Sequence, residues 1–195
     1  MGTGDPLSFT TTGAGVTVDL LAGKNVECTF LNTKPSPTRT QGFWQTHTNF
    51  TSEVFQTVLA SPMPIGISPH KGLITTPKQL FGAYYSSIPK KSDGTKRSPL
   101  DQARMQLLQQ LVTAKLNCAA FGCAASALSL ITTADTNYAG TDKAAILASA
   151  SALDTFNNSG DTIIISPPLP SPGKATPTDS KNLAAGAGIQ FWDTP

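Results

Sequence analysis

Residues Ser98 to Leu116, SPLDQARMQLLQQLVTAKL, predict the longest helix of the chain and with it the fold class. Ser98 is a favourable N-cap residue, and Pro99 suits the first helical position. Apolar residues follow at helical spacing in two adjacent rows, and polar residues occupy the opposite face. The rows are Leu100, Ala103, Leu107, Leu111 and Ala114, and Met105, Leu108, Val112 and Leu116; the polar face is Gln102, Gln106, Gln109, Gln110 and Thr113. We expect this helix to lie at the centre of the core.

Four more helices are predicted beside it, which gives a helical domain of about five helices at residues 42–160. Their signals are N-cap residues, a proline at the first helical position and glycines where helices end. The predicted helices are Thr51 to Ala60, Pro77 up to Pro89, Ala124 to Tyr138 and Asp142 to Asn158. Between the first two of these helices, residues 63–72 are rich in proline and glycine. They are expected to form an ordered loop or a loop that extends into solvent.

The first 33 residues predict a small antiparallel β-portion. At most three short strands are expected, at residues 7–12, 16–21 and 25–31, because apolar and polar residues alternate there between glycine-containing turns. Residues 34–41 follow as a linker of proline and threonine. A β-portion followed by a run of helices is the pattern of an α+β protein.

Two motifs meet where the β-portion ends. Cys28-Thr29-Phe30-Leu31-Asn32-Thr33 is followed by Gln41-Gly42-Phe43-Trp44-Gln45-Thr46-His47. Together they resemble a module of secreted and surface-displayed bacterial proteins, in which a prealbumin-like (collagen-adhesin B-type) β-domain precedes a Gln-Gly-(Phe/Tyr)-Trp-x-x-His segment and helices. The resemblance covers residues 26–117 and implies an extracellular location and a partial immunoglobulin- or prealbumin-like β-portion, without a particular chemistry. Because such β-domains are more than twice as long, we expect their missing strands to have been cut away or to come from another chain.

The composition agrees with an extracellular location. Only 13% of the residues are charged, and polarity comes instead from 17 serines and 26 threonines, as is common in exported bacterial proteins. The net charge of +2 is too small to indicate nucleic acid or an anionic membrane surface as a partner. No apolar run is long enough for a membrane span. The first residues lack the features of a signal peptide, so we expect a processed or excised piece of a secreted protein.

The cysteine spacing predicts one local disulfide. Cys118 and Cys123 are separated by Ala-Ala-Phe-Gly, and Gly122 is expected to end the preceding helix in the left-handed conformation. Five residues of separation at a helix end can bring two α-carbons within disulfide range. The alternative is two buried thiols in an alanine-rich core. Cys28 then has no partner, and the three cysteines do not have the paired spacing of a zinc site.

The two histidines are weak candidates for chemistry. His47 and His70, with Glu53, are the residues that could hold a metal or act as an acid–base pair. However, no catalytic or metal-binding motif surrounds them, so we expect no catalytic residue, no metal and no cofactor. We expect instead that His47 and Trp44 lie on one face of a turn and donate their ring hydrogens to backbone carbonyls.

The last 35 residues, 161–195, are expected to include an extended tail that either folds back onto its own domain or docks on a neighbouring subunit. Residues 162–165 predict a short strand, 166–180 a proline-rich linker, and 183–192 an apolar tail. We expect Ile189, Phe191 and Trp192 to be buried at least partly against another copy of the chain.

These features favour a non-enzymatic, extracellular structural or adhesive module. We expect a subunit of a homo-oligomer or filament at the cell surface or extracellular matrix, in which neighbours complete each other by exchange of strands and tails. The alternative is a ligand- or carbohydrate-binding module with Trp44, Tyr84 and Tyr85 as stacking surfaces, and a metal-dependent or histidine-based enzyme ranks third. The exposure of Trp44 separates the first two hypotheses, because a ring that stacks on a ligand must be accessible.

Overall fold

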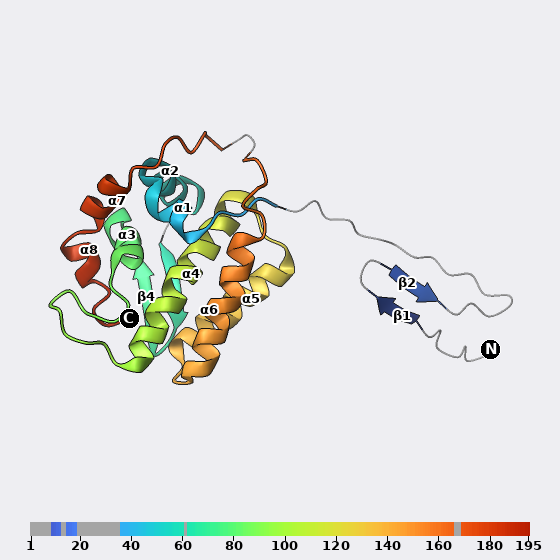
Figure 1. Ribbon diagram of the computed structural model, residues 1–195, viewed down its shortest axis with the longest axis horizontal. Helices are drawn as coiled ribbons and strands as arrows, with labels where there is room; N and C mark the ends of the chain where they lie inside the picture. The colour runs from blue at the N-terminus through green and yellow to red at the C-terminus, as the bar shows by residue number, and fades with distance from the viewer. Residues whose placement is uncertain (1–8, 13–14, 19–35, 61, 166–168) are drawn as a thin grey trace. The chain divides into compact units, whose positions relative to one another are not determined.

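The computed structural model describes residues 9–12, 15–18, 36–60, 62–165 and 169–195. The chain divides into two compact units, Met1–Lys34 and Pro35–Pro195. In the first unit, β1 (Phe9–Thr12) pairs antiparallel with β2 (Gly15–Val18), and Phe9 lies opposite Val18 (Figure 1). The third predicted strand and the Cys28 motif lie outside the described residues.

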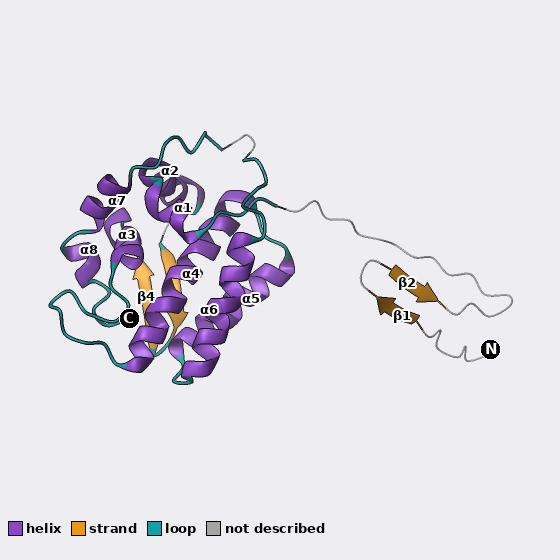
Figure 2. Cartoon of the chain, in the orientation of Figure 1, coloured by secondary structure: helices purple, strands orange, loops and turns teal. Residues whose placement is uncertain are grey.

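The second unit is mostly helical, with one small antiparallel sheet among its described residues (Figure 2). Its elements are α1 (Gln41–Thr46), α2 (Thr48–Glu53), the π-helix η1 (Val54–Val58), β3 (Met63–Ile67), β4 (His70–Ile74), α3 (Pro77–Tyr85), α4 (Pro99–Phe121), α5 (Ala125–Ala139), α6 (Lys143–Asn158), α7 (Pro177–Ala184) and α8 (Ala187–Gln190). The predicted α+β class is therefore confirmed, whereas an immunoglobulin-like fold is not shown. Eight α-helices are described where about five were predicted, because α1, α7 and α8 are short and have no long apolar repeat.

Helix α4 is the central helix, as predicted. The Ser98 hydroxyl accepts a hydrogen bond from the Asp101 amide, and Pro99 occupies the first turn. Helices α5 and α6 pack on one side of α4, and α3 and α1 contact another (Figure 1). The apolar rows from Ala103 to Leu116 are almost completely buried.

The polar face predicted for α4 is wrong at Gln109 and Thr113, which are buried. The Gln109 side chain donates to the backbone carbonyls of Ala83 and Tyr84 in α3, each at 3.3 Å. The Thr113 hydroxyl lies 3.1 Å from the Tyr84 hydroxyl. Because α3 covers this face, polar side chains there serve as hydrogen-bond partners for a neighbouring helix instead of meeting water.

Residues 63–72 begin a β-hairpin and are not the loop predicted from their prolines and glycines. Strands β3 and β4 pair with Met63 opposite Ile74, and the side chains of Met63, Ile65 and Ile74 enter the core. The Gly66 amide donates to the Asp135 carboxylate of α5 at 2.7 Å, and the other oxygen of Asp135 pairs with Lys115 of α4 at 2.7 Å. Contacts far apart in the sequence therefore hold this hairpin.

The C-terminal segment also differs from its prediction. Residues 162–165 form no strand; residues 177–184 and 187–190 are helical and pack against α3. A side chain at Gly82 of α3 would overlap the backbone of Gly188 in α8, and one at Gly188 would overlap Lys78. Because both residues are glycines, the backbones of α3 and α8 can touch. This contact depends on both helices and cannot be predicted from the sequence of either one alone.

Candidate functional site

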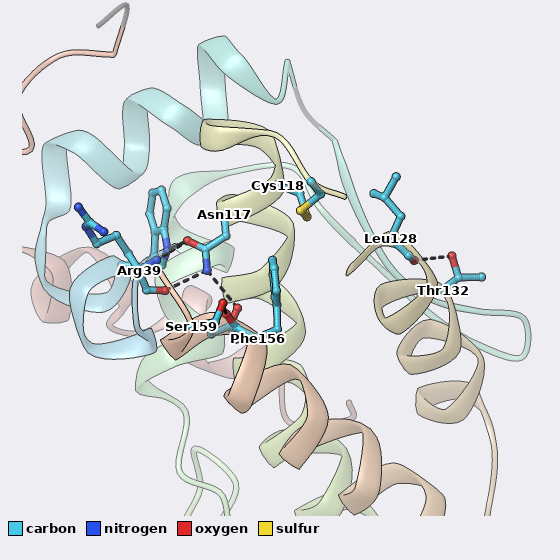
Figure 3. Close-up of a disulfide and its surroundings, with 10 residues drawn as sticks. Arg39, Asn117, Cys118, Leu128, Thr132, Phe156 and Ser159 are labelled. Atoms are coloured by element: carbon cyan, nitrogen blue, oxygen red, sulfur yellow. Dashed lines mark hydrogen bonds between the residues drawn. A yellow bond between two sulfur atoms is a disulfide. The ribbon is translucent and has the colours of Figure 1, made fainter. Parts of the chain in front are cut away.

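A buried hydrogen-bond network holds the motif Arg39 to Trp44 against the helices. The Asn117 side-chain oxygen accepts from the Arg39 amide at 2.7 Å and from Nε1 of Trp44 at 2.9 Å (Figure 3). Its nitrogen donates to the Arg39 carbonyl at 2.9 Å and to Oδ1 of Asn157 in α6 at 3.0 Å. We call Arg39, Trp44, Asn117 and Asn157 the Asn117 network. It uses all four hydrogen-bonding positions of the Asn117 amide.

The three arginines of the chain are all buried, and each donates to backbone carbonyls. Arg39 donates to Thr38, Gly160, Asp161 and Ile163; Arg97 donates to Ser87, Lys90 and Asp193; and Arg104 donates to Tyr138 and Gly140. The planar guanidinium offers five donors, so one side chain can join several segments. Arg39 was expected in a linker but is buried, because three of its four carbonyl partners belong to residues 160–163.

The predicted disulfide is present. Cys118 at the end of α4 and Cys123 are bonded, with their α-carbons 4.9 Å apart (Figure 3). Gly122 ends the helix with φ +75° and ψ 160°, so φ is positive as expected but ψ lies outside the left-handed helical region. The bond therefore closes a short turn between α4 and α5.

The predicted metal or acid–base candidates lie in separate places. His47 lies between α1 and α2, where its ring stacks on Phe43 at 4.0 Å and Nδ1 donates to the Phe43 carbonyl at 2.9 Å. Glu53 is an exposed residue at the end of α2, and His70 opens β4. Within the described part of the chain, no three side chains of His, Cys, Asp or Glu gather as a metal site would require. The structure does not bring these three candidates together.

The aromatic candidates for ligand stacking are buried in two of three cases. Trp44 is 0% exposed and Tyr84 is 3% exposed, so neither ring can stack on a ligand from solvent. Trp44 packs against Phe50 and Phe121, and its Nε1 donates to a side chain and not to the backbone carbonyl we expected. Burial raises the pKa of the Tyr84 hydroxyl. Tyr85 is half-buried, with its hydroxyl 3.0 Å from that of Ser180.

The C-terminal tail is buried against its own chain. Trp192 is 2% exposed; its Nε1 donates to the Gln79 carbonyl at 2.8 Å, and its ring lies against Gly72 of β4. Ile189 and Phe191 are half-buried. Trp192 is thus buried by its own chain, because α7 and α8 turn the tail back onto α3. A contact of Ile189 and Phe191 with another copy stays a prediction.

A pocket of about 590 Å³ lies beside this tail. It is lined by residues from the β3–β4 hairpin, the loop after α3, α4, the end of α5 and the C-terminal segment. Those that matter here are His70, Lys91, Asp101, Tyr138, Trp192 and Asp193. Sequence reasoning missed the pocket because its walls come from five separate segments.

One residue that lines this pocket, Tyr138, is 1% exposed, and its hydroxyl has no hydrogen-bond partner among the described residues. Nη2 of the buried Arg97, whose guanidinium faces the pocket-lining Asp193, also has none. Nη2 of Arg97 lies 3.8 Å from Oδ1 of Asp193, which is an ion-pair distance but not a hydrogen bond. Burial raises the pKa of Tyr138, so its hydroxyl keeps its proton and can donate it. An unpartnered buried polar group is unusual, and the Tyr138 hydroxyl is one that belongs to a residue of the pocket wall.

Comparison with protein-family models, curated proteins and solved structures yields no match for this chain. None of the helices in the described ranges is sufficiently long and apolar to cross a membrane.

Proposed function

We propose that this protein is an extracellular structural or adhesive module that assembles through its N-terminal β-unit. The observation that carries the proposal is the β1–β2 sheet, whose described part has two strands in a unit separate from the helical one. A two-stranded hairpin alone is marginally stable in water, so strands from a neighbour would stabilise it. The disulfide supports an oxidising, extracellular location.

The route of assembly is revised by the fold of the tail. Residues 183–192 are engaged inside the helical unit, which leaves the N-terminal unit as the element for exchange. In strand addition, backbone amides and carbonyls of one chain pair with an open sheet edge of the next. The burial of Trp44 also supports a structural function over ligand binding, because a ring that stacks on a ligand must be exposed and this ring is not.

A proline in β1 tests the assembly. Thr11 pairs with Val16 of β2, and Thr11→Pro removes a backbone donor and restricts φ within the strand. The matched control is Ser171→Pro, in an exposed, irregular segment already flanked by prolines. We expect light scattering and negative-stain images to show assemblies of the wild type and of Ser171→Pro, and monomers of Thr11→Pro with unchanged helical circular dichroism. A monomeric wild type, or an unchanged mass for Thr11→Pro, would refute assembly through this unit.

A second proposed function, binding of an extracellular ligand, is favoured by the pocket at Tyr138. The site differs from the one predicted, since Trp44 and Tyr84 take no part in it. The support is the unpartnered hydroxyl of Tyr138, a residue that lines a pocket large enough for a small organic molecule.

A further inference from the structure

The pocket beside Tyr138 has one unpartnered donor, while its two aspartates already accept hydrogen bonds. Both oxygens of Asp101 accept, one from Arg104 at 3.1 Å and the other from Ser98 at 2.8 Å. Both oxygens of Asp193 accept from Ser92, one from its amide and the other from its hydroxyl. In contrast, the described part of the chain offers no acceptor to the Tyr138 hydroxyl or to Nη2 of Arg97. A ligand that pairs with the Tyr138 hydroxyl must therefore bring an acceptor.

The charges at the pocket also favour a ligand that brings an acceptor, and in particular an anionic one. Asp101 is paired with Arg104, and Asp193 faces Arg97. Lys91 also lines the pocket and takes part in no ion pair among the described residues. Lys91 therefore supplies a positive charge that is not held in an ion pair, and hydrogen bonds to an anionic acceptor are about twice as strong as those between neutral groups.

The remaining wall is apolar. The pocket is bordered by Pro69, Phe191 and Trp192, and the rings of the last two meet edge to face at 4.9 Å between centroids. A mineral anion such as phosphate would leave these surfaces against water. An organic acid would place its carboxylate at the donors and its hydrocarbon part against the rings.

We propose that this pocket binds a small organic carboxylate. The Tyr138 hydroxyl and Lys91 contact the carboxylate, Arg97 adds a buried positive charge behind Asp193, and Trp192 contacts the apolar part of the ligand. The inference rests on the second proposed function, ligand binding, and names the class of ligand. It does not depend on assembly through the β-unit.

Isothermal titration calorimetry of the full chain with matched acid and amide pairs tests the proposal. The probes are acetate, benzoate and phenylacetate, each with its primary amide, together with inorganic phosphate. The variants are Tyr138→Phe, which removes only the unpartnered hydroxyl, and Tyr85→Phe, which removes a tyrosine hydroxyl outside the pocket and serves as the matched control. We expect at least one acid to bind ten times more tightly than its amide, and Tyr138→Phe to reduce this affinity at least tenfold while Tyr85→Phe leaves it unchanged.

The unfavourable outcomes are distinguishable. Equal affinity for an acid and its amide would keep ligand binding and overturn the carboxylate assignment. Tighter binding of phosphate than of any acid would show a mineral-anion site and overturn it as well. If no probe binds, or if Tyr138→Phe binds the acid like the wild type, the pocket at Tyr138 is not the site. In that case a crystal structure with only an ordered water on Tyr138 would account for the free hydroxyl.

Discussion

Replacement of Asn117 by alanine tests the claim that the Asn117 network holds the helical unit together. The substitution leaves four buried groups without a partner: the amide and the carbonyl of Arg39, Nε1 of Trp44 and Oδ1 of Asn157. A buried polar group that loses its partner costs about 1–3 kcal/mol. At the low end of that range for each group, Asn117→Ala should reduce the free energy of unfolding by about 4 kcal/mol.

This loss is large against the total stability of a domain, which is about 5–15 kcal/mol. For a unit of this size it corresponds to a decrease in melting temperature of roughly 8–16 °C, at about 2–4 °C per kcal/mol. Guanidinium unfolding of the full chain, followed by circular dichroism at 222 nm, measures the change. The control is Asn182→Ala, an exposed asparagine on α7, which should change stability by less than about 0.5 kcal/mol.

A double-mutant cycle with Trp44→Phe isolates one bond of the network. The phenylalanine lacks the Nε1 donor, so part of the penalty of Asn117→Ala is already absent in its background. We expect the two changes to be less than additive by about 1 kcal/mol. A loss below about 1 kcal/mol for Asn117→Ala alone would show that water replaces the amide, and the reasoning about this network would fail.

Three other predictions concern local features. Cys118→Ala with Cys123→Ala should lower the free energy of unfolding by about 2 kcal/mol, since the bond closes a short loop, with no change in helical circular dichroism. Tyr138→Phe without ligand should leave the melting temperature unchanged or raise it, because the lost hydroxyl has no described partner; a decrease of several degrees would reveal an unseen one. The pKa of Asp93 lies below its usual 3.8, first because the Thr95 hydroxyl donates to it, so its contribution to stability is present above pH 3.8 and is lost as the pH falls through the lowered pKa. Thr95→Val should raise that pKa towards its usual value in an NMR titration, and an unchanged pKa would assign the shift to the remaining backbone hydrogen bond.

The sequence determined the features whose partners are close along the chain. The capping box at Thr76 and Gln79 and the Ser98 cap were predictable because both partners lie within one helical turn. The disulfide was predictable because its cysteines are five residues apart. The apolar rows of α4 were also predictable, since helical periodicity is itself a local property.

Only the tertiary structure decided which polar and apolar groups are enclosed by distant segments. Arg39 donates to a carbonyl 121 residues away, and Trp192 donates to one 113 residues away. The sequence around Arg39 and Trp192 gives no signal of such distant partners. Arg39 was therefore predicted to lie in a linker, and Trp192 was predicted to lie at least partly against another copy. The unpartnered hydroxyl of Tyr138 belongs to the same class. The sequence contributes an amphipathic side chain, and five separate segments enclose it with no described acceptor; that is a property of the packed chain and not of any stretch of it.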